Sequence, residues 1–309
     1  MKKSKISVII PVFNEEGNIV SFYKNLKQNL PISHSIEIIY IDDGSTDRTL
    51  TLIKELSNKN SEVKYISLTR NFGHQYALKA GIDNSSGDAV ISLDGDFQHP
   101  ASLIPQMISK WKDGYKIVFT RRVDDERINF LKRSTSKAFY RLINSMSEAN
   151  IPDGSADFRL LDREVVNVIK QSSESTLFLR GLVSWTGYKA YGIDYRPETR
   201  AWGISKYSYP KMIHFALDAI TSFSTVPLRF ATIIGLFMSL FSGVYGIYAV
   251  VVFLVDRQNV IIGWPSVIIS VLFIGGLQLL ILGIVGEYIG KIFLETKKRP
   301  LYIIQDSNI

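Results

Sequence analysis

The sequence has no cysteine among its 309 residues. A disulfide framework, a thiolate zinc site, an iron–sulfur cluster and a cysteine nucleophile are therefore excluded. The chain also lacks the patterns G-x-x-x-x-G-K-[ST] and G-x-G-x-x-G, which excludes a P-loop and a dinucleotide-binding fingerprint. No recognised nucleic-acid-binding motif accompanies the formal net charge of +7. We therefore expect that charge to favour anionic substrates or lipid head groups, and no nucleic acid as a partner.

Charge is missing from two long stretches near the C-terminus. Phe230–Val255 and Gln258–Gly286 contain no Asp, Glu, Lys or Arg. A helix needs about 20 apolar residues to cross a bilayer, and each stretch exceeds that length. We predict a hairpin of two transmembrane helices at 229–255 and 260–290, against the alternative of a helical hairpin buried in a soluble core.

The charges that flank this hairpin predict its orientation. Arg229 precedes the first helix and several basic residues follow the second, whereas the loop between them holds a single Arg. Basic residues favour the cytoplasmic side. We therefore predict a multi-pass protein of the cell inner (plasma) membrane, with the domain 1–203, the tail 291–309 and both termini in the cytoplasm. Residues 204–228 place apolar side chains at helical spacing, which predicts a juxtamembrane amphipathic helix or a helix packed on the globular domain.

Short β-branched runs alternate with longer amphipathic segments in residues 1–203. The expected strands are Ile6–Ile10, Ile36–Ile41, Val63–Leu68, Ala89–Leu93 and Ile117–Thr120, and the expected helices are roughly 15–30, 46–58, 73–83 and 101–112. Such alternation predicts an α/β fold with a mostly parallel sheet covered by helices on both faces. Ligands bind these sheets beyond the carboxyl ends of the strands.

Polar clusters fall at the ends of the first four expected strands. They are Pro11–Glu16, Asp42–Ser45, Arg70–Gly73 and Asp94–Gln98. In the last cluster, Asp94 and Asp96 can share a hard divalent cation, Mg²⁺ or Mn²⁺, with Gln98 as a neutral third contact. The alternative is a solvated turn.

The ordered series of these clusters resembles glycosyltransferase family 2. The resemblance extends through Asp157-Phe158-Arg159-Leu160, Arg200-Ala201-Trp202-Gly203-x-Ser205-Lys206-Tyr207 and the tail from Gly286-Glu287-Tyr288 to Arg299-Pro300-Leu301-Tyr302. Within the family, the chain is most similar to polyprenyl-phosphate glycosyltransferases, which include the dolichol-phosphate mannose synthases and the bacterial bactoprenol glucosyltransferases.

The resemblance implies a GT-A (Rossmann-like) fold and a metal-dependent, inverting transferase. The implied reaction moves one hexose, preferably glucose from UDP-glucose, to undecaprenyl or another polyprenyl phosphate, in lipopolysaccharide or other cell-envelope glycosylation. The alternatives are a dolichol-phosphate-mannose-type synthase using GDP-mannose, a processive synthase, a non-catalytic nucleotide-sugar sensor and a flippase. The absence of Q-x-x-R-W argues against the processive synthase. Homo-oligomers formed through the transmembrane helices are a further expectation.

The resemblance also implies roles for single residues. The catalytic residues are Asp157, Asp96 and Arg200, and the metal ligands are Asp94, Asp96 and Gln98. The nucleotide sugar is bound by Pro11, Asn14, Glu15, Asp43, Arg70 and Asp94, and the acceptor phosphate by Arg122, Arg133, Arg200 and Lys206. A phosphate monoester with a second pKa of about 6 is mostly ionised at neutral pH. We therefore expect Asp157 to orient groups or to act as an assisting base. Because His74, His99 and His214 have no ligand-like spacing, we predict that they bind no metal.

Overall fold

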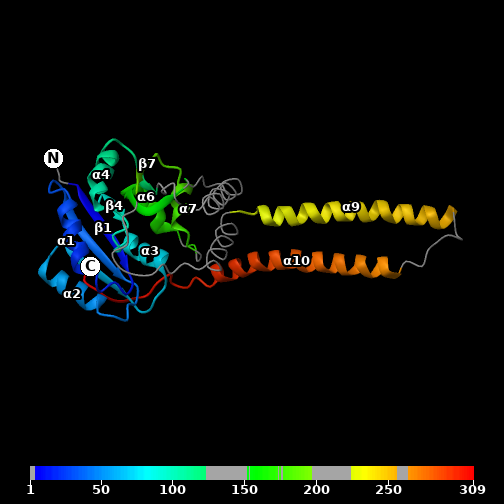
Figure 1. Ribbon diagram of the computed structural model, residues 1–309, viewed down its shortest axis with the longest axis horizontal. Coiled ribbons are helices and arrows are strands. Elements are labelled where there is room, and N and C mark those ends of the chain that lie inside the picture. The colour runs from blue at the N-terminus through cyan, green and yellow to red at the C-terminus, as the bar shows by residue number, and fades with distance from the viewer. Residues whose placement is uncertain are drawn as a thin grey trace. The chain divides into compact units, whose positions relative to one another are not determined.

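The computed structural model describes residues 4–122, 152, 154–172, 174, 177–196, 224–255 and 264–309. The chain divides into two compact units (Figure 1). One unit, which we call the sheet unit, comprises Met1–Ala216 together with Arg299–Ile309. The other, the helical unit, comprises Leu217–Lys298. The C-terminal residues of the chain thus belong to the sheet unit, although the helical unit precedes them in sequence.

The strands of the sheet unit form one sheet. They are β1 (Lys5–Val12), β2 (Ser35–Asp42), β3 (Val63–Leu68), β4 (Ala89–Ser92), β5 (Ile117–Arg122), β6 (Ser155–Asp162), β7 (Ala190–Tyr195) and β8 (Ile304–Ser307). Their order in the sheet is β7-β5-β6-β4-β1-β2-β3-β8. Strands β1 to β4 run parallel to one another, and β7 runs parallel to β5. Strands β6 and β8 are antiparallel to their neighbours. The sheet is therefore mixed.

Helices cover both faces of this sheet. They are α1 (Ile19–Asn29), α2 (Thr49–Lys59), α3 (His74–Asn84), the 3-10 turn η1 (Ala101–Leu103), α4 (Ile104–Lys112), α6 (Arg163–Gln171) and α7 (Leu179–Trp185). Alternate residues of a strand point to opposite faces. Val8 and Ile10 accordingly pack in the core with α1, α2 and α4, whereas Ile9 packs in a second core with α3, α6 and α7. Burial on both faces explains why β1, β2 and β4, in the middle of the sheet, are mostly apolar.

The α/β architecture with flanking helices is the fold class that the sequence predicts. All five predicted strands and all four predicted helices are present, with ends that differ by a few residues. The helix expected over 15–30 begins only at Ile19, because residues 13–18 form the loop that follows β1. The segment 101–112 begins as η1 before it continues as α4. Strands β6, β7 and β8 were not predicted.

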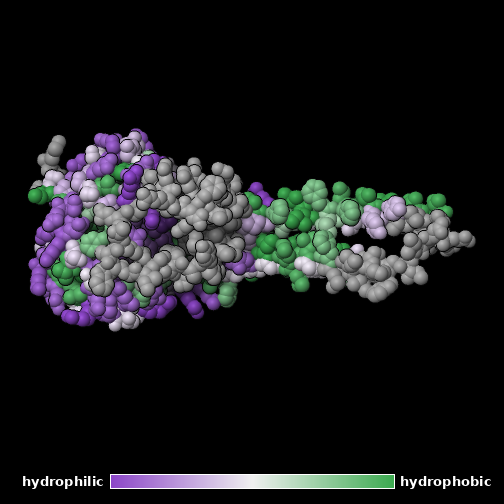
Figure 2. Space-filling model, viewed as in Figure 1, coloured by the Kyte–Doolittle hydropathy of each residue, from purple (hydrophilic) through white to green (hydrophobic). Residues whose placement is uncertain are grey.

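The helical unit contains two long helices, α9 (Val226–Val255) and α10 (Trp264–Thr296). Both are long and apolar enough to cross a membrane, over Val226–Tyr248 and Phe273–Thr296. Figure 2 shows apolar side chains on the surface of both helices. The second helix extends beyond its predicted end at residue 290. Most of the predicted amphipathic helix 204–228, and the segment between α9 and α10, lie outside the described residues.

The parallel strands determine where the polar clusters meet. Strands β1, β2, β3 and β4 are adjacent and run in the same direction. The loops that follow their carboxyl ends therefore lie at one edge of the sheet, which is the usual place for a ligand in such folds.

Candidate active site

The loop after β1 is fastened to the loop after β2. Asn14 has a left-handed backbone with φ of 55°, and its Oδ1 accepts a hydrogen bond from Thr46 N at 2.8 Å. Asn14 N donates to Ser45 Oγ at 2.9 Å, and Glu15 N donates to Thr49 Oγ1 at 2.9 Å. These bonds fix the backbone of Asn14 and Glu15. Both residues are predicted to bind a nucleotide sugar.

Asp43 connects the loop after β2 to the loop after β3. Its side chain is buried, and its carboxylate accepts hydrogen bonds from Phe72 N at 2.8 Å and Gly73 N at 2.9 Å. Burial raises the pKa of Asp43 above its ordinary value, although the two N–H groups oppose that rise. Both carboxylate oxygens therefore hold the neighbouring loop, and the predicted contact of Asp43 with the nucleoside stays a prediction.

Gly44 is required where these two loops meet. Its φ is +69°, and a Cβ at this position would lie 2.4 Å from the backbone carbonyl carbon of Arg70. Only glycine combines this backbone conformation with such a close approach. Arg70 in turn places its guanidinium carbon 4.1 Å from the centre of the Phe72 ring, in a cation–π contact.

The loop after β4 carries the two predicted metal-binding carboxylates. Within it, Phe97 has φ of 64°, which is rare for a bulky side chain. Its ring packs edge-on against Phe22, with the centroids 5.2 Å apart. Gln98 N donates to Asp96 Oδ1 at 3.1 Å. Backbone strain of this kind persists where the surrounding packing imposes it and is common at functional sites.

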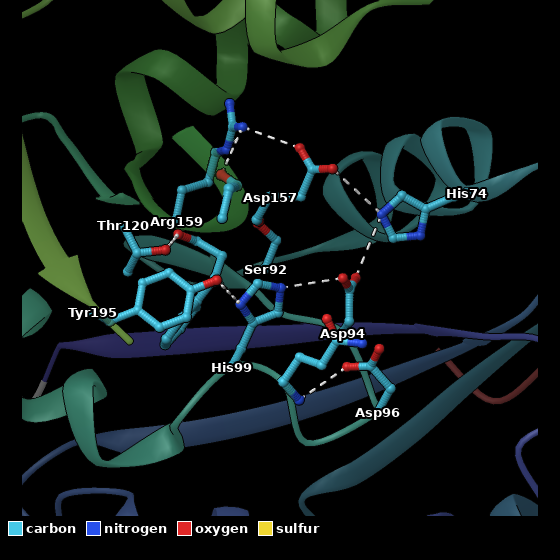
Figure 3. Close-up of polar contacts among 12 residues, drawn as sticks. His74, Ser92, Asp94, Asp96, His99, Thr120, Asp157, Arg159 and Tyr195 are labelled. Atoms are coloured by element: carbon cyan, nitrogen blue, oxygen red, sulfur yellow. Dashed lines mark hydrogen bonds and ion pairs between the residues drawn. The ribbon is translucent and has the colours of Figure 1, made fainter. Parts of the chain in front are cut away.

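Asp94 lies between two histidines (Figure 3). His99 Nε2 is 3.2 Å from Asp94 Oδ2, and His74 Nε2 is 3.4 Å from Asp94 Oδ1. Among the residues that the structure describes, none gives the buried Oδ1 a hydrogen bond. Burial by itself would raise the pKa of Asp94, but His74 and His99 outweigh it and the pKa is lowered. Asp94 is therefore an ionised side chain with one oxygen held by a hydrogen bond.

Asp157 is the centre of a second charged group. Arg180 makes a bidentate ion pair with its carboxylate, with Nε to Oδ1 and Nη2 to Oδ2 both at 2.9 Å. Arg159 Nη2 donates to Oδ1 at 3.1 Å. The backbone is fixed as well, because Ser92 Oγ donates to the Asp157 carbonyl oxygen at 2.6 Å. Burial opposes the charged form of Asp157, but Arg180, His74 and Arg159 hold its pKa well below the ordinary value.

His74 connects the two carboxylates. Its Nε2 lies 3.4 Å from Asp94 Oδ1 and 3.7 Å from Asp157 Oδ2, as Figure 3 shows. Burial lowers the pKa of His74, but Asp94 and Asp157 raise it more strongly, to about 9. The imidazole is therefore cationic at neutral pH, and the site alternates anionic and cationic side chains.

The carboxylates of Asp94 and Asp96 form a partial metal site. Within the described ranges, no group of three or more His, Cys, Asp or Glu side chains is arranged to hold a metal ion. Mg²⁺ commonly takes one or two protein carboxylates and completes its shell with water and substrate phosphate oxygens. The pair fits such an ion, because Asp94 Oδ1 is a carboxylate oxygen that accepts no hydrogen bond from the described part of the chain.

The structure describes most of the predicted site residues. Asp94, Asp96 and Gln98 share the loop after β4, and Asp157 joins them through His74. Those at the ends of the neighbouring strands are Pro11, Asn14, Glu15, Asp43 and Arg70. Arg122 ends β5, with its N donating to Gly154 O at 3.0 Å. Arg133, Arg200 and Lys206 lie outside the described residues.

Five side chains contribute to the site although no sequence pattern assigned them a role there. They are His74, His99, Arg159, Arg180 and Tyr195. The two histidines were considered only as metal ligands, for which their spacing is unsuitable. A better signal for His74 was its position directly after the polar cluster that ends β3. For Arg180, in α7, the sequence offered no comparable signal.

Known proteins resemble this chain over nearly its whole length. A family model described as glycosyl transferase family 2 matches residues 7–169. The bactoprenol glucosyl transferase of Shigella phage SfII is 44% identical over 305 residues, which cover 98% of this chain and 98% of that protein. The protein of the same name in Shigella phage SfV is 44% identical over 303 residues, with 98% of each chain covered. Among solved structures, S. aureus TarS 1-349 in complex with UDP-GlcNAc has a TM-score of 0.48 at 17% identity, covering 71% of this chain and 66% of that chain.

Proposed function

Because this chain belongs to glycosyl transferase family 2, we propose that it transfers a single glucose from UDP-glucose to undecaprenyl phosphate. The observation that carries this proposal is the match along 98% of both chains to relatives named bactoprenol glucosyl transferase. The donor follows from the same resemblance. The reaction is an inverting displacement, in which a phosphate oxygen of the lipid bonds to the anomeric carbon and UDP leaves from the opposite face.

The apolar helices α9 and α10 support a lipid acceptor. The head group of a polyprenyl phosphate lies at the membrane surface while its tail lies in the bilayer. An enzyme anchored by two transmembrane helices would therefore encounter its acceptor by diffusion within the membrane rather than from solution. With basic residues on both outer flanks of the hairpin, we place the sheet unit on the cytoplasmic face of the inner membrane.

The carboxylates after β4 are suited to a divalent cation on the donor. Asp94 and Asp96 would hold Mg²⁺ or Mn²⁺, with Gln98 as a third contact. That cation supplies positive charge to the diphosphate as the sugar leaves it. Two observations support these assignments: Gln98 N donates a hydrogen bond to Asp96 Oδ1, and the buried Asp94 Oδ1 accepts none from the residues that the structure describes.

Asp157 acts as an orienting anion in this proposal. A carboxylate whose pKa is held well below its ordinary value is a weak base. The acceptor phosphate, with a second pKa of about 6, needs little help to lose its proton. Asp157 instead holds Arg180 and His74, two cations beside the predicted metal ligand Asp94. Cations in this position favour the approach of two polyanionic substrates. Arg122, Arg133, Arg200 and Lys206 are the proposed contacts of the acceptor phosphate.

The proposal is tested by incubating the full-length protein in detergent with undecaprenyl phosphate, radiolabelled UDP-glucose and Mg²⁺ or Mn²⁺. We expect a labelled lipid with one hexose per chain by mass spectrometry, an equal amount of UDP, and no product with EDTA. An Asp94→Asn/Asp96→Asn double variant is expected to lose activity by at least about 100-fold.

Parallel reactions with GDP-mannose, UDP-galactose and UDP-N-acetylglucosamine test the donor. Transfer from GDP-mannose in preference to UDP-glucose would favour a dolichol-phosphate-mannose-type synthase. A ladder of products with several sugars would favour a processive synthase. Absence of lipid product with every donor, from protein that remains folded, would overturn the proposal.

A further inference from the structure

His99 is a buried polar side chain to which the proposed reaction assigns no role. It follows the loop after β4, and only 8% of its surface is exposed. Its ring packs against Phe158 and Tyr195, with centroid distances of 5.5 and 5.7 Å. Both ring nitrogens have polar partners, since Nε2 lies 3.2 Å from Asp94 Oδ2 and Nδ1 lies 3.0 Å from Tyr195 Oη. The imidazole is thus fixed both by packing and by two hydrogen bonds (Figure 3).

The chemistry of the partners gives the direction of these hydrogen bonds. A carboxylate oxygen accepts hydrogen bonds, so Nε2 of His99 is the donor to Asp94 Oδ2. Nδ1, the other ring nitrogen, is then the acceptor for the hydroxyl of Tyr195. Burial raises the pKa of Tyr195 to about 12, which keeps its hydroxyl protonated. The result is a relay in which Tyr195 donates to His99 and His99 donates to Asp94.

The relay crosses the sheet. Tyr195 ends β7, which is separated from β4 by β5 and β6 in the strand order. Tyr195 is buried, and it is the last residue of β7. The carboxylate after β4 is therefore supported from a distant strand of the same rigid sheet.

The two oxygens of Asp94 have different surroundings. Oδ2 accepts the hydrogen bond from His99, whereas Oδ1 is buried, has no hydrogen bond from any described residue and lies 3.4 Å from His74 Nε2. Histidines and carboxylates beyond a metal's own ligands commonly orient those ligands, and their loss weakens metal binding. From this geometry we propose that His99 and Tyr195 are positioning residues that hold Asp94 with Oδ1 directed at the divalent cation of the donor diphosphate. This inference rests on the proposed function, in which Asp94 is a metal ligand.

The test measures metal binding rather than turnover. Electron paramagnetic resonance of Mn²⁺, titrated with full-length protein in detergent and saturating UDP, gives the Mn²⁺ dissociation constant. Three variants dissect the relay. Tyr195→Phe removes only the hydroxyl, His99→Phe removes both hydrogen bonds, and His99→Gln keeps an amide N–H in reach of Asp94.

Two matched controls remove a similar group where it makes fewer contacts. Tyr40→Phe deletes a buried hydroxyl that has no hydrogen-bond partner among the described residues. His34→Gln replaces a histidine whose Nε2 likewise has no partner among them. Thermal unfolding of each variant, read by intrinsic fluorescence, confirms that the protein is folded.

We expect His99→Phe to weaken Mn²⁺ binding by about 10- to 100-fold and Tyr195→Phe by a smaller factor. His99→Gln should recover part of the loss, and both controls should bind Mn²⁺ as the unchanged protein does. Partial recovery by Gln separates positioning from a merely structural role, since a packing defect would not be repaired by an amide N–H.

Two outcomes overturn the inference and are distinguishable from each other. If Asp94→Asn abolishes Mn²⁺ binding while folded Tyr195→Phe and His99→Phe bind it normally, the relay has no positioning role and the proposed metal site stands. If the unchanged protein binds no Mn²⁺ with UDP, or Asp94→Asn binds it normally, the metal part of the proposed function fails and this inference fails with it.

Discussion

At the scale of single residues, Asp157 determines how charge is distributed in the site. Its carboxylate has three cationic neighbours, of which Arg180 makes the shortest contacts, a bidentate pair of hydrogen bonds at 2.9 Å. A planar guanidinium matches two carboxylate oxygens, whereas an ammonium group can only approach as a point charge. The position of Arg180 therefore depends on its shape as well as its charge.

Replacing Arg180 by Lys keeps the charge and removes the paired hydrogen bonds. We expect kcat for glucose transfer to fall by about 10- to 100-fold, because displaced catalytic groups cost rates of that order. The Arg180 side chain is 30% exposed, so the thermal midpoint should change little. Arg121→Lys is the control, since Arg121 makes one exposed ion pair with Asp194 at 2.7 Å. An unchanged kcat in Arg180→Lys would contradict the proposed role of its geometry.

Glu37 is a buried acid on β2 with no proposed catalytic role. Its carboxylate pairs with Lys5 Nζ at 2.7 Å, accepts a hydrogen bond from Ser86 N at 2.8 Å, and accepts another from Ser7 Oγ. Burial raises the pKa of Glu37, but Lys5, Ser7 and Ser86 together lower it to about 2. Because the folded pKa lies below the unfolded value of about 4.3, the charge of Glu37 stabilises the folded state at neutral pH.

The pKa of Glu37 predicts a pH-dependent stability. The stabilisation, of about 3 kcal/mol, should be complete above the unfolded pKa and be lost as the pH falls towards 2. Urea unfolding of full-length protein in detergent measures it. Glu37→Gln should unfold at lower urea than the unchanged protein at pH 7, and the difference should shrink to about half at pH 3. A difference that does not depend on pH would show that the ionised carboxylate is not its cause.

At the scale of loops and strands, Gly44 joins the loops after β2 and β3. Gly114 offers a matched comparison, because its φ is also positive, +91°, yet a Cβ there would meet nothing within 4 Å. Gly114→Ala should cost about 1–2 kcal/mol of unfolding free energy, from backbone strain alone. Gly44→Ala adds a clash with the backbone of Arg70. It should cost more, and it should raise KM for UDP-glucose by about 10-fold through displacement of the loop. Equal effects of the two substitutions on KM would contradict the role of the contact.

The C-terminal strand β8 closes an edge of the sheet. It pairs antiparallel with β3, with Ile66 opposite Ser307 and Ser67 opposite Asp306. Beyond it, Asn308 accepts from Tyr65 N at 2.7 Å and donates to Ser57 Oγ at 2.6 Å. An uncovered edge strand is a template for aggregation, so β8 protects β3 as well as stabilising it.

Asn308 and Asp306 allow this role to be tested by substitution. Asn308→Ala should lower the free energy of unfolding by about 1 kcal/mol, since two hydrogen bonds to a partly exposed side chain are lost. Asp306→Asn should have little effect, because its ion pair with Lys54 is exposed. Urea unfolding measures both. A larger effect for Asp306→Asn than for Asn308→Ala would show that charge, rather than strand pairing, holds the tail.

The contrast between β1 and β8 shows what the sequence could predict. β1 is mostly apolar, and the repeated strand–helix pattern predicts both that it is a strand and that it runs parallel to its neighbours. β8 has the sequence IQDS, without such a pattern. It is a strand because β3 offers a free edge, and the bonded residues Tyr65 and Asn308 are 243 positions apart.

The same distinction applies to the site. Asp94, Asp96 and Asp43 were predictable, because parallel strands bring the loops at their ends together. Arg180 and Tyr195 were not, because α7 and β7 reach the site through packing that no local pattern encodes. Motif resemblance identified Asp157, but its surroundings of Arg180, Arg159 and His74 became known only from the fold.

At the scale of the whole molecule, chain connectivity ties the helical unit to the sheet unit at both ends. Residues up to Ala216 and from Arg299 onward belong to the sheet unit. If α9 and α10 form a transmembrane hairpin, both of these connections must lie on the same side of the bilayer. The sheet could not incorporate β8 otherwise, because β8 pairs with β3 within one unit.

The absence of cysteine makes this topology testable with single introduced thiols. Asn259→Cys lies in the segment of the chain between α9 and α10, and Lys112→Cys lies at the exposed end of α4. In intact bacterial cells, a membrane-impermeant maleimide should label Asn259→Cys, whereas Lys112→Cys should react only after permeabilisation, because the basic flanks of the hairpin predict a cytoplasmic sheet unit. Transferase activity of both variants is the control for correct folding. Labelling of Lys112→Cys in intact cells, with Asn259→Cys protected, would indicate the opposite orientation. The sheet unit would then lie outside the cytoplasm, away from the proposed donor UDP-glucose.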